Sequence, residues 1–266
     1  MLRTFNTLGA GGSFRRLGAA GGGGLASRVM SYLSTLSPTL LLKFNETSGN
    51  VINYGSDGGA GTVSGCTQAQ VGQLGASEAY LYDGVDDIVT FTNASLPTTK
   101  ALTTQRWCYL IKPTNYGEGG YGKVAWWSSI YTLSMAVNTM FARVALSTTP
   151  AESVPNVGQV DFIGSWVLLF VDYDDGNALG LGRRLRIIRA TLASEATLLT
   201  LSTNTAGVGT VVTPVENFIV GNRGTLDLTF NGLFDFAFIS AGLWSPSATP
   251  ADLSVPNSIR SMVFGV

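Results

Sequence analysis

The chain contains no histidine and few charged residues. Its 266 residues include 16 basic and 17 acidic side chains, together 12% of the sequence, against about 25% in an average protein. Without imidazole, neither a Ser-His-Asp nor a Cys-His nucleophile can be built, and histidine metal ligands are excluded. The formal net charge of -1 offers no general attraction to nucleic acid or to an acidic membrane, so we expect neither as a partner.

Cysteine and long apolar runs are scarce as well. Cys66 and Cys108 could form one disulfide or remain two buried thiols, and we favour buried thiols because cysteine is among the most buried residue types. No run of about 18 apolar residues occurs, so no membrane-spanning helix is predicted. The N-terminus is basic, but glycine stands where a signal peptide needs its apolar core. We therefore expect synthesis in a host cytoplasm without an export signal.

Residues 1–38 differ in composition from the rest of the chain. Residues 1–26 are glycine-rich and hold no acidic side chain, and such a segment has high backbone entropy and cannot form a core. It is either a solvated tail or an arm that orders on a partner, and we favour a docking arm. Its candidate docking residues are Arg3, Phe5, Phe14, Arg15 and Arg16. The spacing in Ser27–Leu36 predicts a short helix, capped by Ser27 and ended by Pro38.

Residues 39–266 are typical of one all-β domain without an internal linker. Short β-prone runs alternate with turn residues, and only Thr249–Leu253 indicates a helical turn, with Thr249 as its cap and Pro250 in its first position. This pattern predicts a two-sheet antiparallel sandwich rather than a βαβ fold. The predicted strands span residues 40–44, 51–54, 62–64, 69–74, 79–82, 88–91, 105–112, two within 124–137, 140–146, 165–173, 183–189, 195–201, 210–213, 216–221 and 226–240.

The strongest turn signal lies in residues 79–92, AYLYDGVDDIVTFT. Asp-Gly between two β-prone runs favours a hairpin, because glycine tolerates a positive φ and aspartate bonds its own backbone. We expect Ala79–Tyr82 to pair with Ile88–Phe91. The carboxylates of Asp83, Asp86 and Asp87 would then face water as turn residues rather than hold a cation.

Four segments carry a family resemblance when taken together. They are Leu41–Gly49 followed by Asp57-Gly58, Tyr82–Val89, Arg106–Pro113, and Phe218–Gly221 with Phe230–Ile239. In this order they resemble the concanavalin A-like lectin/glucanase superfamily, specifically the laminin-G-like jelly rolls common in bacterial and phage proteins. The resemblance covers about residues 39–253 and implies a jelly-roll sandwich preceded by an extended N-terminal arm. The arm lies outside the family pattern, and Phe236 stands where the family usually has an acidic residue.

Catalytic carboxylates are not arranged as this superfamily's glucanases require. That branch carries E-x-D-x-x-E on one strand, which places alternate carboxylates on the same face, since glycoside hydrolysis needs two carboxyl groups roughly 5–10 Å apart. The glutamates form no such motif; they are Glu46, Glu78, Glu118, Glu152, Glu195 and Glu216. We therefore expect a protein that is not an enzyme.

A calcium site is the one cofactor that the resemblance implies. In related jelly rolls an early-loop acid and an aspartate of the closing motif lie close together, and hard cations need several oxygen ligands. The matching residues are Asn45, Glu46, Asp57 and Asp235. The alternative, which we favour, makes these residues turn formers and caps.

Sugar binding commonly uses exposed aromatic rings beside polar side chains. The candidates are Tyr116 and Tyr121 in a glycine-rich loop, and the adjacent pair Trp126 and Trp127. Because neighbouring residues of a strand point to opposite faces, one tryptophan belongs to the core and the other points outward. The outward ring could be a sugar platform or a contact with another subunit.

These observations favour a non-enzymatic structural or interaction protein of a phage particle. It would be a capsid decoration, fibre or tail-associated subunit, bound to other virion proteins through residues 1–38 and assembled as a homo-oligomer in the virion. The alternative is a carbohydrate-binding adhesion module that recognises a host surface glycan. The two functions are compatible in one chain.

Overall fold

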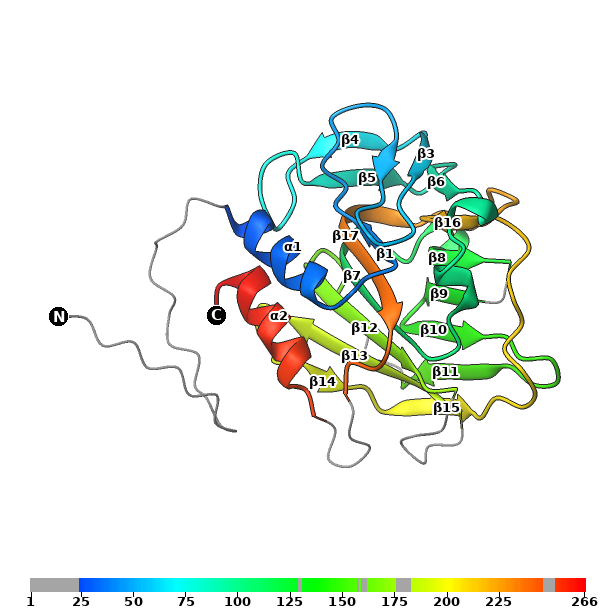
Figure 1. Cartoon of the computed structure of the whole chain (residues 1–266). Helices are drawn as coiled ribbons and strands as arrows, with labels where there is room; N and C mark the ends of the chain where they lie inside the picture. The colour runs from blue at the N-terminus through cyan, green and yellow to red at the C-terminus, as the bar shows by residue number, and fades with distance from the viewer. Residues whose placement is uncertain (1–23, 129–130, 157, 159–161, 176–182, 246–251) are drawn as a thin grey trace.

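Two antiparallel β-sheets and two helices make up the computed structural model (Figure 1). The structure describes residues 24–128, 131–156, 158, 162–175, 183–245 and 252–266. The predicted all-β sandwich of jelly-roll type is confirmed. The candidate docking residues of segment 1–23, and Thr249 and Pro250 of the predicted helical turn, lie outside the described residues.

The eight-stranded sheet is built around its longest strand, β17. Its order is β14 (Thr197–Leu198), β13 (Leu185–Thr191), β12 (Val167–Tyr173), β7 (Gln105–Pro113), β17 (Asn231–Ala241), β5 (Ala79–Asp83) and β4 (Thr67–Gln70), and β1 (Leu40–Leu42) also pairs with β17. A bulge in β17 between Phe234 and Phe236 leaves Asp235 outside the regular ladder.

The nine-stranded sheet lies against it. Its order is β15 (Leu201–Thr205), β11 (Ala151–Pro155), β10 (Thr139–Val144), β9 (Tyr131–Ala136), β8 (Tyr121–Trp127), β16 (Phe218–Val220), β6 (Ile88–Phe91), β3 (Ala60–Ser64) and β2 (Val51–Ile52). Single 3-10 turns at Asn93–Ser95 (η1), Thr99–Ala101 (η2) and Glu118–Gly120 (η3) join strands. Strands β11 and β15 were not predicted from the sequence. A strand was predicted at residues 210–213, but these residues form only an isolated bridge, between Val211 and Leu146.

Alternating side chains create the main core between the sheets. In β9, Tyr131, Leu133 and Met135 point into this core, while Thr132 and Ser134 belong to the outer face. The period of two is the geometric property of a strand that gives each sheet an inner and an outer face. The prediction for the tryptophan pair is confirmed, because Trp127 is in the core and Trp126 is half-buried on the outer face.

A second apolar core covers the outer face of the eight-stranded sheet. Helices α1 (Leu25–Thr35) and α2 (Ser254–Phe264) lie side by side over this sheet (Figure 1). The helices contribute Val29, Met30, Leu33, Ile259 and Val263, and the sheet side contributes Leu41, Cys108, Leu110, Leu168, Phe170, Ile188, Phe236, Phe238 and Trp244. Strand β12 is therefore buried on both faces, which explains its nearly continuous apolar sequence. Phe236 belongs to this helix-covered layer.

The predicted helix at 27–36 is confirmed, with a different start. It begins at Leu25 after Gly24, and no side chain caps it, so Ser27 lies in the first turn instead of at the cap. The helix falls within the segment 1–38 that the sequence assigns to the arm, yet it packs on the sandwich. Arg106 connects the two parts: its Nη2 donates to the Leu36 carbonyl at 2.9 Å and its Nε to Ser240 Oγ at 2.8 Å.

The predicted hairpin at residues 79–92 is wrong. Strand β5 pairs with β4 and β17 in one sheet, whereas β6 pairs with β3 and β16 in the other. The Asp-Gly turn therefore crosses between the two layers, because both edges of each strand are occupied by other partners. Asp83 and Asp86 are exposed as expected, but Asp87 is buried.

The two cysteines are free and buried, as predicted. Cys66 belongs to the core between the sheets and Cys108 to the helix-covered core. Burial raises the pKa of the Cys66 thiol to about 12 and that of Cys108 well above its ordinary value. Both are therefore unreactive thiols at neutral pH. None of the helices formed by the described residues is long and apolar enough to cross a membrane.

Candidate functional site

The candidate calcium ligands have separate partners. Glu46 accepts hydrogen bonds from the Ile52 backbone N–H and the Tyr80 hydroxyl, both at 2.9 Å, and Asn45 beside it is half-buried. Asp57 accepts from the Thr98 and Thr99 backbone N–H groups at 2.9 and 2.7 Å, at the start of η2. Partial burial opposes ionisation of Asp57, but these bonds and those from the two threonine side chains hold its pKa below the usual value.

Asp235 is the most deeply buried of these candidates. Its Oδ2 accepts from the Leu74 backbone N–H at 3.0 Å, while its Oδ1 has no hydrogen-bond partner. Burial raises the pKa of Asp235 to about 8, and the charge of Glu78 acts in the same direction. Leu74 is part of the helix-covered core. Asp235 therefore holds loop 72–75 against the covered layer, and it does not join Glu46 and Asp57 in a group of carboxylates with close oxygens.

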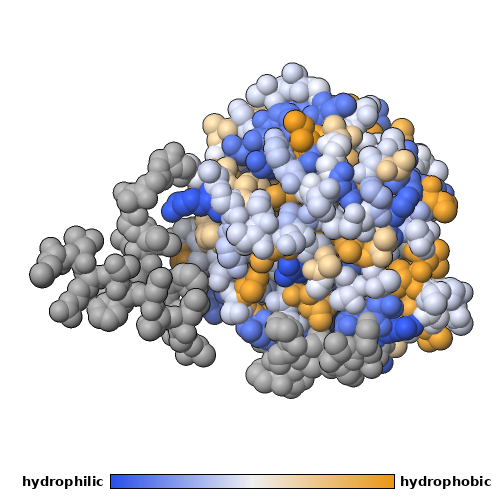
Figure 2. Space-filling model, viewed as in Figure 1, coloured by the Kyte–Doolittle hydropathy of each residue, from blue (hydrophilic) through white to orange (hydrophobic). Residues whose placement is uncertain are grey.

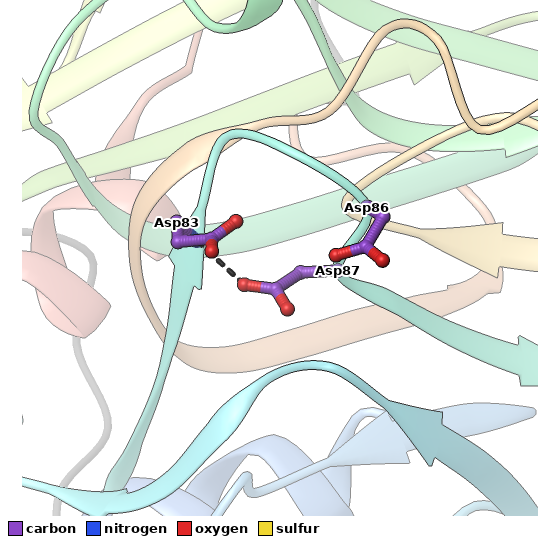
Figure 3. Close-up of side chains that lie close together, drawn as sticks. All are labelled: Asp83, Asp86 and Asp87. Carbon is purple, nitrogen blue, oxygen red and sulfur yellow. Dashed lines mark hydrogen bonds between the residues drawn. The ribbon is translucent and has the colours of Figure 1, made fainter.

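One acidic cluster does form among the described residues, at the turn between the sheets (Figure 3). Carboxylate oxygens of Asp83, Asp86 and Asp87 lie within 4.8 Å of one another. The Asp83 backbone N–H donates to Asp87 Oδ2 at 2.5 Å, and Asp83 Oδ1 accepts from the Val85 backbone N–H at 2.8 Å. Burial, reinforced by the charges of Asp83 and Asp86, raises the pKa of Asp87 to about 6. These hydrogen bonds close the turn between the sheets, and closing the turn is enough to explain why the three carboxylates lie together.

Two of the aromatic candidates lie on the outer face of the nine-stranded sheet. Tyr121 and Trp126 both lie on β8 with their side chains on this face, and each is partly exposed. Trp126 stands in register with Ile219 of β16 on one side and Thr132 of β9 on the other. Trp127, the fourth candidate, lies on the opposite face in the core, where its indole Nε1 donates to the Glu216 carbonyl.

Tyr116 reaches the same region from the loop before β8. Its hydroxyl donates to Asn138 Oδ1 at 2.9 Å, in the turn between β9 and β10. The close return of this loop depends on Gly117, which has φ +96° and would place a Cβ 2.4 Å from the Gly122 Cα. Only glycine tolerates that combination of backbone angle and contact. The Tyr116 ring itself packs in part against the core between the sheets, so we call Tyr121 and Trp126 the aromatic face.

The loop 222–229 borders the aromatic face. Gly221 ends β16 with φ +87°, and a side chain there would clash with the ring of Tyr82. The Lys123 backbone N–H donates to the Leu228 carbonyl at 2.8 Å, which places the loop over β8. Arg223 in this loop forms an ion pair with Asp227, so that hydrogen bonding to the guanidinium holds the pKa of Asp227 well below its ordinary value.

Cations accompany the aromatic rings on this face. The Lys123 Nζ lies 5.0 Å from the centre of the Tyr121 ring and donates to Ser134 Oγ at 2.9 Å. Burial, together with the nearby charges of Arg223 and Arg143, lowers the pKa of Lys123 to about 8. Sequence reasoning found the aromatic residues but missed these three cations. Lys123 could have been found from the sequence, because it lies between Tyr121 and Trp126 in the β8 sequence YGKVAWW. Arg143 and Arg223 could not, because they reach the site through strand pairing that the sequence does not specify.

The face of the molecule shown in Figure 2 is weakly polar. In Figure 2 pale residues of intermediate hydropathy predominate, with small separate hydrophilic and hydrophobic areas. The cavity inside the sandwich, lined by Gln105, Trp107 and Tyr131 among others, has room for no more than about one water molecule. This cavity is therefore too small to hold a sugar.

No protein-family model matches the chain, and no curated protein matches it in sequence. Solved structures with a similar fold are jelly-roll β-sandwiches of toxin binding domains. The binding domain of botulinum neurotoxin serotype D has a TM-score of 0.53 and 10% identity, over 79% of this chain and 49% of that chain. The binding domain of botulinum neurotoxin DC, in complex with rat synaptotagmin II, has a TM-score of 0.53 and 7% identity, over 86% and 51%.

A third similar structure is the receptor binding domain of botulinum neurotoxin mosaic serotype C/D, with a TM-score of 0.53 and 10% identity over 79% of this chain and 48% of that chain. The chain thus spans about half the length of the structures it matches. At such low identity the likeness establishes the fold and leaves the function to be argued from the site.

Proposed function

We propose that the chain is a non-enzymatic, laminin-G-like binding module that recognises a glycan through its aromatic face. The observation that carries this proposal is the placement of Tyr121 and Trp126 on the outer face of the nine-stranded sheet, both partly exposed. An aromatic ring offers a flat apolar surface to a sugar ring. Asn138 and Arg223, which are both at least partly exposed, supply hydrogen-bonding groups around it.

The absence of an enzymatic role is part of the proposal. Glycoside hydrolysis needs two carboxyl groups roughly 5–10 Å apart that flank the scissile bond. Around the aromatic face, within the described part of the chain, Asp227 is bound by Arg223 and Thr225. Glu118 accepts from the Thr229 backbone N–H at 3.4 Å. Both carboxylates therefore serve loop structure, which supports recognition rather than hydrolysis.

A glycan array tests this function with matched variants. The Trp126→Ala variant removes the central ring, and Tyr54→Ala is the control because Tyr54 is an aromatic residue, 46% exposed, outside the aromatic face. We expect glycan binding by the native chain and by Tyr54→Ala, and loss of binding by Trp126→Ala with an unchanged unfolding midpoint. Binding that survives in Trp126→Ala would reject the aromatic face as the glycan site. If the ring instead contacts another subunit, Trp126→Ala would change the mass measured by light scattering.

We also propose that this module is displayed on a phage particle. The supporting observation is that α1, which follows the glycine-rich segment, packs on the side of the sandwich opposite to the aromatic face. A partner holding residues 1–23 would then leave the aromatic face outward. In this proposal the virion proteins contact Arg3, Phe5, Phe14, Arg15 and Arg16.

Deletion of residues 1–23 tests the display proposal, because it leaves α1 and the covered core intact. Purified particles would be analysed by mass spectrometry. We expect the full chain in the particles and the truncated chain only in the soluble fraction, with equal thermal stability. Equal incorporation of the truncated chain would contradict docking through this segment.

A further inference from the structure

Three cationic side chains converge on the outer face of the nine-stranded sheet, although the whole chain has a formal net charge of -1. Lys123 comes from β8, Arg143 from β10 and Arg223 from the loop after β16. Lys123 stands in register with Ser134 of β9 and Arg143 with Thr132 of the same strand, so these two cations lie on either side of β9 on one face. The charges of Arg143 and Arg223 act, after burial, to lower the pKa of Lys123. Arg143 stands in register with Thr132, which in turn faces Trp126 across β9 and β8. The cations therefore lie beside the aromatic face.

Arg223 is compensated, because its Nε and Nη2 both donate to the Asp227 carboxylate, whereas Lys123 and Arg143 are poorly compensated. Arg143 Nε is buried and has no hydrogen-bond partner, and in the described ranges no carboxylate lies within 4.0 Å of Lys123 or Arg143. Glu152 is opposite Arg143 in the register of β10 and β11, yet the two do not form an ion pair. A buried N–H group without a partner is uncommon, because its desolvation is not repaid. Such a group is accounted for when a ligand or a water supplies the acceptor.

We propose that Lys123 and Arg143 form an anion-binding subsite for an acidic group, a carboxylate or a sulfate, on the glycan bound at the aromatic face. The inference rests on the proposed function and specifies its ligand as an acidic saccharide. A guanidinium matches the planar pair of acceptor oxygens in such groups, and the lysine adds a compact charge. The ring of Trp126 would hold the sugar while the cations hold its acidic substituent. Ser134 would orient Lys123 through their 2.9 Å hydrogen bond.

Inorganic sulfate tests the subsite without any glycan. The full chain is titrated with sulfate against chloride at constant ionic strength, and the Nε–H signals of arginine side chains are followed by NMR. We expect a saturable shift of the Arg143 Nε–H signal. Arg28, which is exposed on α1, should show only a small linear drift and serves as the internal control. If Arg143 and Arg28 drift alike, the subsite is rejected.

A glycan array with neutral, carboxylated and sulfated members tests the ligand class. We expect acidic glycans to bind, and the Arg143→Gln variant to lose roughly 10- to 100-fold in affinity, the usual effect of one charged hydrogen bond. The control Arg28→Gln should bind like the native chain. Lys123→Gln provides a second variant if Arg143→Gln fails to fold. The carboxylated and sulfated arms identify which acidic group is preferred.

The two proposals can fail separately. Binding of neutral glycans alone, with native affinity in Arg143→Gln, would overturn the anion subsite and leave the glycan-binding function intact. A saturable sulfate shift without any bound glycan would support the subsite and overturn the sugar-binding role of the aromatic face. Loss of both signals would overturn both.

Discussion

The two outer faces of the sandwich differ in what lies over them. The face of the eight-stranded sheet is apolar, with Leu110, Phe170 and Phe238, and the chain's own helices cover it. The face of the nine-stranded sheet carries the buried polar residues Thr132 and Ser134 and the partly exposed ring of Trp126, and no described helix packs on it. A sheet face that is covered from within the chain is used for stability, whereas one left with polar and aromatic side chains is available for recognition.

Each face also contains a buried ionisable group whose pKa is about 8, an acid on the covered side and a base on the other. Asp235 lies under loop 72–75 beside the covered core, and Lys123 lies among the cations beside the aromatic face. Burial shifts both groups toward the neutral form, to a pKa of about 8 in each case. A rise in pH through 8 therefore adds a buried negative charge on the covered side and removes a buried positive charge on the other side. This difference between the faces can be tested.

The largest expected difference between the faces is in packing. Phe170→Ala removes a fully buried ring that contacts Trp244 in the covered core, and we expect it to lower the free energy of unfolding by about 3–5 kcal/mol. Trp126→Ala on the other face should cost less than about 1 kcal/mol, because its ring is partly exposed. Urea unfolding measures both values. Equal losses would contradict the assignment of the faces.

The next effect concerns Asp235. Its pKa in the folded chain is about 8 against an ordinary value of 3.8, so the folded state binds the proton more tightly. The resulting stability is fully present below about pH 4 and is lost as pH rises through 8, by at most about 6 kcal/mol at about 1.4 kcal/mol per pKa unit.

In Asp235→Asn the neutral side chain is permanent, so we expect this variant to become more stable relative to the native chain as pH rises from 4 to 8. Denaturant unfolding at several pH values measures the difference. A constant difference across that range would show that Asp235 titrates with an ordinary pKa.

Substitution of Arg106 should lower the stability by a smaller amount, and only on the helix-covered side of the sandwich. Its guanidinium bonds the Leu36 carbonyl after α1 and the Ser240 hydroxyl on β17, and it lies over the ring of Trp244. We expect Arg106→Gln to cost about 1.5–3 kcal/mol and to speed hydrogen exchange in α1. Exchange in β8 and β9 should not change. If exchange accelerates equally in both sheets, Arg106 is not a local tie of the helix.

The smallest expected effect is the pH dependence of acidic-glycan binding. The groups near Lys123 are Tyr121, Ser134, Arg143, and Arg223 with its partner Asp227. Loss of the Lys123 proton above pH 8 should weaken binding of an acidic glycan by about tenfold or less, while binding of a neutral glycan stays constant. Calorimetry between pH 7 and 9 tests this, and a decline that persists in Lys123→Gln would exclude Lys123 as its source.

The sequence predicted the sandwich well because periodicity and turn residues are local signals. Trp126 and Trp127 had to face opposite sides whatever their partners were, and that prediction is confirmed. The hairpin at Asp83-Gly84 failed because a turn signal does not state which strands pair across it. Helix α2 was missed because Pro256 interrupts its sequence, although a proline in the first turn is compatible with a helix.

The candidate site was predicted only in part for a similar reason. An aromatic ring near glycine residues is conspicuous in a sequence, so Tyr116, Tyr121 and Trp126 were identified. The cations come from segments separated by many residues, and only the register of β8, β9 and β10 brings Arg143 near Lys123. The pairing of distant strands is the information that local patterns do not contain.

The central place of β17 has a consequence for synthesis of the protein. This strand pairs with β1, β5 and β7, which precede it in the chain by more than a hundred residues in each case. While the chain emerges from the ribosome, β1 and β5 must wait for their shared neighbour. The eight-stranded sheet can close only when residues 231–241 have been translated, and α2 follows them. We therefore expect folding to be completed late in translation, which makes the half-made chain a substrate for chaperones.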